Sequence, residues 1–224
     1  MPRRRSSSKT LRRTVIGLLV AGVIAFAQWK GWMPKDQPKS SGRNPGQTQS
    51  GSRPSPTPPS GKWQQLNGCT LADDRSNDGD SFDVMHQGAR YTIRLYFADS
   101  PEKYRSHLNA TRLAEQGRYF GGLSEAETVK AGEAARDFTL PRLGRTPFTL
   151  LTRWEKVFGG PRVYAFVTVA DGDLAELLVR EGLARIFTKG ADRPGGGSIR
   201  DQKEKLYALE RAAKKARRGA WGKR

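Results

Sequence analysis

The sequence contains little cysteine or histidine: Cys69, His86 and His107 are the only residues of these two types in a chain of 224. A single cysteine excludes an intramolecular disulfide. The usual zinc sites need several Cys or His ligands, and the chain has too few of them. We interpret Cys69 as a small residue of the first strand. A metal site in this protein is therefore expected to use oxygen ligands.

Acidic residues are almost absent from the N-terminal quarter of the chain. Residues 1–62 contain twelve Lys and Arg against the single acid Asp36. Residues 63–224 have a surplus of only 7 positive charges, and residues 203–224 alone account for that surplus. The net charge of +18 thus describes a basic tail and a basic C-terminal segment. Such charge is by itself weak support for nucleic-acid binding.

Long hydrophobic runs are limited to one, at residues 15–27, and six Arg and Lys precede it. A small-x-small cleavage pattern ends at Ala27, which predicts a secretory signal peptide. Alternatively, Trp29 and Trp32 extend the run into a short signal-anchor helix. Both interpretations predict that residues 1–33 direct export, so that the rest of the protein is either secreted or anchored with its folded domain outside the membrane.

Bulky apolar residues are missing from residues 34–62, which consist mainly of Pro, Ser, Gly, Gln and Lys. Such a segment cannot bury enough surface to offset the entropy lost on ordering. We predict a disordered linker, with a Pro-rich ligand segment as the weaker alternative. The folded domain is then expected to comprise residues 63–224.

Within that domain, apolar and polar residues alternate with a period of two, which is typical of β-strands. The strands are expected to begin at Phe82, to cover 91–97 after a turn at Gln87-Gly88, and to cover 148–154 and 163–169. Capping-box and stop signals predict helices from 124 to about 140, from 173 to 182 and from 199 to 218. We therefore expect a mixed α+β, mainly β domain: a five-stranded barrel of the OB type with about three helices.

Charged residues lie at the ends of the predicted hairpin. Asp80 opens one strand and Asp99 closes the next, so antiparallel pairing brings both carboxylates to the same end of the sheet. Two carboxylates repel each other unless a cation lies between them, and oxygen ligands favour Ca²⁺ or Mg²⁺. Glu102 follows three residues later, close enough to act as a base. Arginines such as Arg94 suit a phosphodiester because guanidinium groups pair with phosphoryl oxygens.

Each of these features also has a purely structural explanation. Asp78-Gly79 is a common turn signal, and Ser100-Pro101-Glu102 has the form of a helix start. Arg94 and Arg162 taken alone fit solvated charges on strands. The combination of the acids with the arginines favours a functional site.

The order and spacing of these motifs resemble the thermonuclease (staphylococcal nuclease-like) family. The resemblance rests on Asp78-Gly79-Asp80-Ser81, on Arg94 fourteen residues after Asp80, and on Asp99-Ser100-Pro101-Glu102. It continues in residues 162–165, Asp171-Gly172, 177–184 and 219–221, and so covers roughly residues 65–222.

The resemblance implies an OB-fold endonuclease that cuts single-stranded DNA and RNA with little sequence preference and leaves 3′-phosphorylated products. The implied Ca²⁺ ligands are Asp80, Asp99 and the backbone carbonyl of Ser100. The implied catalytic residues are the general base Glu102 and the phosphate-binding arginines Arg94 and Arg162.

The sequence departs from the family pattern where the family contacts the nucleotide. Phe158 lies in a segment that replaces a tyrosine-glycine turn, and Phe187 and Lys189 lie where the best-known member has two tyrosines. We predict these three residues as substrate contacts. Residues 104–123 are longer than in that member. They are expected to pack on the barrel, with Arg118 and Tyr119 facing substrate as the alternative.

A second class of function remains open. The same barrel without catalysis could be a nucleic-acid-binding module tethered at the membrane, and a structural protein would need no cation at all. The presence of all the acids and arginines named above favours the enzyme. DNA and RNA are the expected partners. No protein partner is implied, and a monomer is expected.

Overall fold

The computed structural model describes residue 58 and residues 60–222. The predicted export segment, residues 1–33, and nearly all of the predicted linker, residues 34–62, lie outside the described residues, so both stay predictions. Within the described residues, no helix combines the length and the apolar character needed to cross a bilayer.

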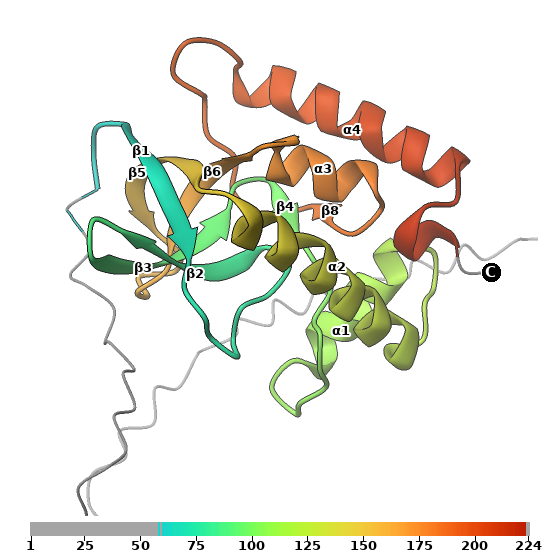
Figure 1. Ribbon diagram of the computed structural model, residues 1–224. Helices are drawn as coiled ribbons and strands as arrows, with labels where there is room; N and C mark the ends of the chain where they lie inside the picture. Colours follow the sequence, from blue (N-terminus) through green and yellow to red (C-terminus); the bar gives the residue numbers. More distant parts are fainter. Residues whose placement is uncertain (1–57, 59, 223–224) are drawn as a thin grey trace, which may run out of the picture. The chain divides into compact units, whose positions relative to one another are not determined.

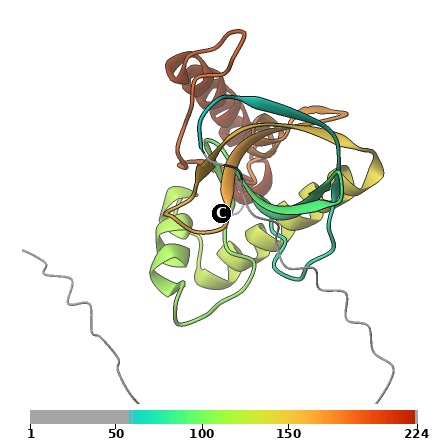
Figure 2. The same cartoon turned by 90° about the vertical axis from the view of Figure 1, so that its left-hand side faces the viewer.

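Five strands form a closed barrel, as predicted (Figures 1 and 2). They are β1 (Gln64–Leu71), β2 (Ser81–His86), β3 (Ala89–Leu95), β5 (Phe148–Lys156) and β6 (Val163–Val169). Neighbouring strands pair antiparallel in the order β3-β2-β1-β5-β6, and the two-residue β7 (Gly172–Asp173) extends the edge at β6. A parallel pairing of β3 with β6 closes the barrel.

The barrel core follows from the period-two pattern of the strands. Along β5, Phe148, Leu150, Thr152 and Trp154 are buried, while the residues that alternate with them are more exposed. Ile93 and Leu95 of β3 face the same core. Full burial of such a side chain stabilises a fold by roughly 1.5–3 kcal/mol, so these alternating residues fix the register of the strands.

Within residues 60–222, four α-helices accompany the barrel, one more than the sequence predicted for the folded domain. They are α1 (Ala110–Tyr119), α2 (Glu125–Arg145), α3 (Leu174–Arg180) and α4 (Ile199–Lys215). The unpredicted helix is α1. Its N-cap, Asn109, makes no side-chain capping bond, and its first turn contains no acidic residue, so the usual start signals are missing.

Helix α2 begins as predicted and ends later than predicted. Ser124 and Glu127 form the expected capping box. The predicted end before Pro141 is wrong, because the helix continues to Arg145. Proline removes one backbone donor, but packing holds the last turn: Leu143 is buried, and Arg142 lies 3.5 Å from the centre of the Phe138 ring.

The C-terminal helix α4 lies alongside α3 (Figure 1). It ends at Lys215, three residues before the predicted Arg218, because Arg217 adopts a left-handed backbone with φ of 52°. The chain then forms a 3₁₀ turn, η1 (Gly219–Gly222). Phe120, Ala131 and Ala220 form a second small core that joins α1, α2 and η1.

The predicted strand at 91–97 is shifted by two residues in the structure, since β3 begins at Ala89 and ends at Leu95. Phe97 has a φ of 64°, so the chain turns sharply there. Asp99 consequently lies in a separate two-residue strand, β4 (Ala98–Asp99), which pairs antiparallel with β8 (Arg185–Ile186). In this register Asp99 lies opposite Arg185, which decides the surroundings of its carboxylate.

Candidate active site

The loop Asp78-Gly79-Asp80 leads into β2 and is held on two sides. The backbone N–H of Asp78 donates to the Ser81 carbonyl at 2.7 Å, so this segment is a turn, as the structural explanation required. Thr139 of α2 donates its hydroxyl to the Gly79 carbonyl at 2.9 Å. The loop directs the buried Asp80 carboxylate inward, where it accepts a hydrogen bond from the Ser100 N–H at 2.5 Å.

Arg94 lies between the two carboxylates that the hairpin was expected to bring together. Its partner across the β2–β3 register is Ser81, next to Asp80. The Nη2 atom of Arg94 is 3.0 Å from Asp80 Oδ2 and also donates to Asp99 Oδ1. The cation between Asp80 and Asp99 in this structure is therefore a guanidinium group.

Asp99 has more cationic partners than any other acid of the site. Arg185 Nε and Arg112 Nη2 each lie 2.6 Å from a carboxylate oxygen of Asp99, and Gln116 Nε2 donates to it at 3.1 Å. Burial alone would raise the pKa of Asp99, but the guanidinium groups of Arg94, Arg112 and Arg185 outweigh it and lower the pKa. Asp99 is thus a stably ionised carboxylate.

Asp80 is in the opposite electrostatic condition. Burial raises the pKa of Asp80 to about 7, and the charges of Asp99 and Asp78 add to this effect. Arg94 and the Ser100 N–H offset it only in part. Asp80 is therefore a buried acid whose negative charge is incompletely compensated by the protein.

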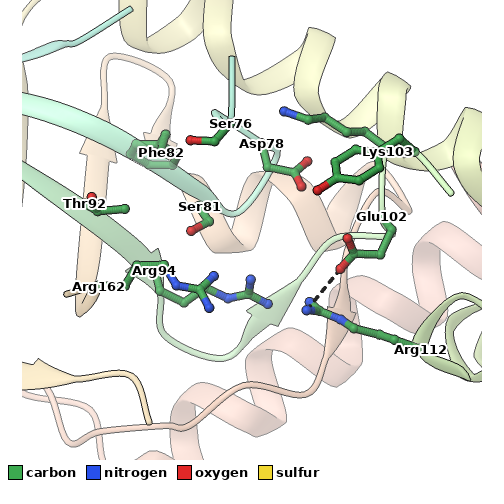
Figure 3. A pocket seen from close by; sticks show the side chains of 11 residues that line it. Ser76, Asp78, Ser81, Phe82, Thr92, Arg94, Glu102, Lys103, Arg112 and Arg162 are labelled. Carbon is green, nitrogen blue, oxygen red and sulfur yellow. Dashed lines mark ion pairs between the residues drawn. The ribbon is translucent and has the colours of Figure 1, made fainter. Parts of the chain in front are cut away.

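Helices α1 and α2 hold the backbone of Glu102, one at its N–H and the other at its carbonyl. Its backbone N–H donates to Gln116 Oε1 at 3.0 Å, and its backbone carbonyl packs so closely on Gly132 that no side chain fits there. One of its carboxylate oxygens is 3.0 Å from Arg112 Nη1, an ion pair drawn in Figure 3. The other is 3.3 Å from Asn109 Nδ2. The Glu102 carboxylate is consequently fixed in position and turned toward a cavity.

That cavity has a volume of about 320 Å³ and is shown in Figure 3. Asp78 and Glu102 supply its acids, while Arg94, Arg112 and Arg162 line it from the other sides. Arg162 comes immediately before β6, and the pairing of β6 with β3 brings it near Arg94. Burial lowers the pKa of Arg162, as do the positive charges of Arg94 and Arg112.

A larger cavity of about 710 Å³ contains the three residues predicted to contact nucleotide. Phe158 is 98% exposed and Phe187 is 62% exposed, and the Arg185 guanidinium lies 3.9 Å from the centre of the Phe187 ring. Lys189 is paired with Glu155. The structure therefore places two accessible aromatic faces beside a basic wall.

The oxygen atoms around Asp80, Asp99 and Ser100 are of the type that binds a hard cation. Asp80 and Asp99 supply carboxylate oxygens, and Ser100 supplies a carbonyl together with a buried hydroxyl that has no hydrogen-bond partner. Such all-oxygen sets are the ones that Ca²⁺ prefers. In the described part of the chain, no three His, Cys, Asp or Glu side chains are grouped as a metal site, and Arg94 lies where the two carboxylates converge.

Three residues of the site were not predicted: Arg112, Gln116 and Arg185. Arg185 directly follows Gly182-Leu183-Ala184, one of the segments that carry the family resemblance. That resemblance could have indicated Arg185 as a residue of the site. Arg112 and Gln116 belong to α1, and no feature of the sequence indicated that helix. The expectation that residues 104–123 only pack on the barrel is incomplete, because Arg112 lines both cavities.

The two residues considered as substrate-facing in that segment lie elsewhere. Tyr119 packs against Phe120 and Trp221 and donates its hydroxyl to Glu210 of α4. Arg118 is exposed on the same helix. Neither lines the two cavities of the site.

Comparison with known proteins agrees with this geometry. Residues 92–223, more than half of the chain, match the model of the staphylococcal nuclease homologue family. The chain belongs to this family. The match contains Arg94, Asp99, Glu102 and Arg162, whereas Asp80 precedes it.

A curated relative is named probable endonuclease LCL3, from Komagataella phaffii (strain GS115). It is 26% identical over 155 residues, and the alignment covers 65% of this chain and 65% of the relative. The alignment thus covers slightly less than two-thirds of the length of that protein.

Proposed function

We propose that the protein is a nuclease that hydrolyses phosphodiester bonds of single-stranded DNA and RNA with little sequence specificity. The observation that carries the proposal is the position of the Glu102 carboxylate. It is held against a cavity of about 320 Å³ whose other walls present Arg94 and Arg162. A base and two phosphate-binding cations around one cavity are the groups that phosphodiester hydrolysis requires.

In the proposed reaction, Glu102 takes a proton from the water that attacks phosphorus. Arg94 and Arg162 bind the non-bridging oxygens and stabilise the charge that builds up in the five-coordinate transition state. The P–O5′ bond then breaks and solvent returns a proton to O5′, which leaves a 3′-phosphate and a 5′-hydroxyl. The contacts of Glu102 with Gln116 and Gly132 restrict its position, which favours a reactive geometry.

We propose Ca²⁺ as the cofactor, held by Asp80, Asp99 and the Ser100 carbonyl. When bound, it supplies positive charge that neutralises the phosphodiester. The incomplete compensation of the Asp80 charge and the partnerless Ser100 hydroxyl support a cation at this place. Millimolar extracellular calcium suits a carboxylate site of moderate affinity, which agrees with the proposal that residues 1–33 direct export, either as an anchor or as a leader cleaved near Ala27.

We propose that substrate bases stack on the exposed rings of Phe158 and Phe187. Lys189 would then lie near the phosphate backbone of the nucleic acid. Stacking on aromatic side chains tolerates every base, so it agrees with low sequence specificity. The name of the relative from Komagataella phaffii, probable endonuclease, supports cutting within a nucleic-acid strand.

The test is cleavage of a single-stranded oligonucleotide by the full-length protein in millimolar Ca²⁺, with a chelator as the metal control. We expect Glu102→Gln to reduce the rate by about 10²–10⁴-fold, because it removes the base. Glu133→Gln, at an exposed position of α2, is the matched control and should keep the wild-type rate. If the wild-type protein retards the oligonucleotide in a gel and leaves it intact, the protein is a binding module and the proposed chemistry is wrong.

A further inference from the structure

Helix α1 directs two side chains of one face into the site. Arg112 and Gln116 are four residues apart, so they lie one above the other on the helix. Gln116 is fully buried and bonds to Asp99, Ser100 and the Glu102 backbone. Arg112 is nearer the mouth of the site, and its side chain is 38% exposed. The buried residue therefore fixes the framework, whereas the exposed one is able to change partners.

The ion pairs of Arg112 are not needed to neutralise Asp99. Without Arg112, Asp99 still has Arg94, Gln116 and Arg185, and Arg185 is only 4% exposed. The second pair, with Glu102, joins Arg112 to the proposed base. This pair occupies one of the two carboxylate oxygens of the proposed base, so it competes with the attacking water for that oxygen.

The two cavities of the site meet at a row of guanidinium groups. The residues that line both cavities are Arg94, Arg112 and Arg162. The smaller cavity is lined by four basic and two acidic side chains, so its formal charge is positive. Arg94 and Arg112 are close enough to Arg162 to disfavour its charge. A cluster of like charges of this kind is an anion-binding arrangement, and a phosphate there would relieve the repulsion.

We propose that Arg112 is a third phosphate-binding residue of this site. On substrate entry its guanidinium group leaves Glu102 and pairs with a phosphate of the strand that passes from the larger cavity to the smaller one. The exchange frees the Glu102 carboxylate at the moment when the phosphate arrives. The inference rests on the proposed nuclease function, and α1, the helix that carries Arg112, is the part of the fold that the sequence did not predict.

Binding in the presence of a chelator tests the contact without cleavage. The affinity of the full-length protein for a short, labelled single-stranded oligonucleotide is measured over a range of salt concentrations. The variants are Arg112→Ala, Arg112→Lys and, as the matched control, Arg118→Ala on the exposed face of the same helix. Each phosphate contact contributes about 0.7 to the slope of log affinity against log salt for a single strand. We expect Arg112→Ala to reduce the slope by about 0.7, and the other two variants to keep it.

Steady-state kinetics gives a second readout. We expect Arg112→Ala to raise KM about tenfold or more and Arg112→Lys to restore most of the loss, since a lysine keeps the charge. Unchanged salt slope and KM in Arg112→Ala, with a lower melting temperature, would show that Arg112 only holds Asp99 and Glu102 in place, and the proposal would be wrong. Absence of cleavage by the wild-type protein would contradict the nuclease function alone, because the salt slopes still test the phosphate contact.

Discussion

The α-carbon of Gly132 in α2 packs directly on the backbone of Glu102, with no room for a methyl group between them. Helix α2 thus sets the position of the proposed base through contact of main chain with main chain. A glycine at this place of a helix is conformationally unfavourable, so the close approach is what requires it.

We therefore expect Gly132→Ala to lower both stability and activity. Overpacking of this kind costs about 1–3 kcal/mol, and a displaced Glu102 should reduce kcat more than it changes KM. Thermal melting and steady-state kinetics measure the two effects. Gly144→Ala in the same helix is the control: nothing lies within 4 Å of the added methyl group, so it should stabilise the protein by about 0.5–1 kcal/mol. Equal behaviour of the two variants would contradict the role of Gly132.

Asp80 gives the stability of the protein a defined pH dependence. Its pKa is raised to about 7 in the fold, above the ordinary value of 3.8. The folded state therefore favours the protonated acid, and the free energy of unfolding falls as the pH rises from about 4 to about 7. A single such group changes this free energy by at most about 1.4 kcal/mol per pH unit in that window.

The variant Asp80→Asn has no carboxyl group at this position, so its free energy of unfolding should not fall between pH 4 and pH 7 on account of residue 80. In calcium-free buffer we expect its melting temperature to exceed that of the wild type by an amount that grows between pH 4 and pH 7 and then levels off. The same variant should lose the stabilisation that added Ca²⁺ gives the wild type at pH 8. A difference between the two proteins that stays constant with pH would show that Asp80 titrates normally.

Arg94 and Arg162 are expected to differ in their effect on stability. Arg94 pairs with two buried carboxylates, so Arg94→Gln should lower the melting temperature as well as the activity. Arg162 is disfavoured in its charged form by burial and by neighbouring positive charges. Arg162→Gln should therefore leave the melting temperature unchanged or higher while it reduces cleavage by at least tenfold. A large loss of stability in Arg162→Gln would argue that its role is structural.

Phe158 offers a test of base stacking that does not disturb the core. Its ring is almost completely exposed, so Phe158→Ala should keep the melting temperature. Stacking of a base contributes about 1–3 kcal/mol, and we expect KM for single-stranded DNA to rise roughly 5- to 100-fold. Tyr207→Ala, an exposed aromatic of α4 outside both cavities, is the control and should bind normally. If both variants keep the wild-type KM, the larger cavity does not bind bases by stacking at this ring.

The barrel was predictable because its strands repeat apolar residues with a period of two, as in Ile93 and Leu95. The capped helices were predictable from local signals such as Ser124 and Glu127. Helix α1 was missed because it has neither a capping bond nor an acidic first turn, and tertiary contacts of Leu113 and Gln116 stabilise it instead. Pairs as short as β4 and β8 contain too few residues for any pattern.

The chemistry of the site was easier to predict than its contacts. Asp80 and Arg94 meet because the β2–β3 hairpin fixes their positions, which is a local consequence of the sequence. Asp99 pairs with Arg94 from β4, outside the hairpin, after the turn at Phe97. The pairs that Asp99 makes with Arg112 and Arg185 join residues 13 and 86 positions apart. Such long-range contacts depend on how α1 and β8 pack, and the pattern of apolar residues along the sequence does not predict them.

The parallel pairing of β3 with β6 has a consequence for the synthesis of the protein. It joins Ile93 to Val163, about 70 residues later, and this pairing brings Arg162 beside Arg94. An unfinished chain that ends before residue 162 contains every acidic residue of the site and still lacks two of its arginines, Arg162 and Arg185. In the proposed enzyme, cleavage of nucleic acid thus requires a chain long enough to include β6, and shorter fragments are expected to be inactive.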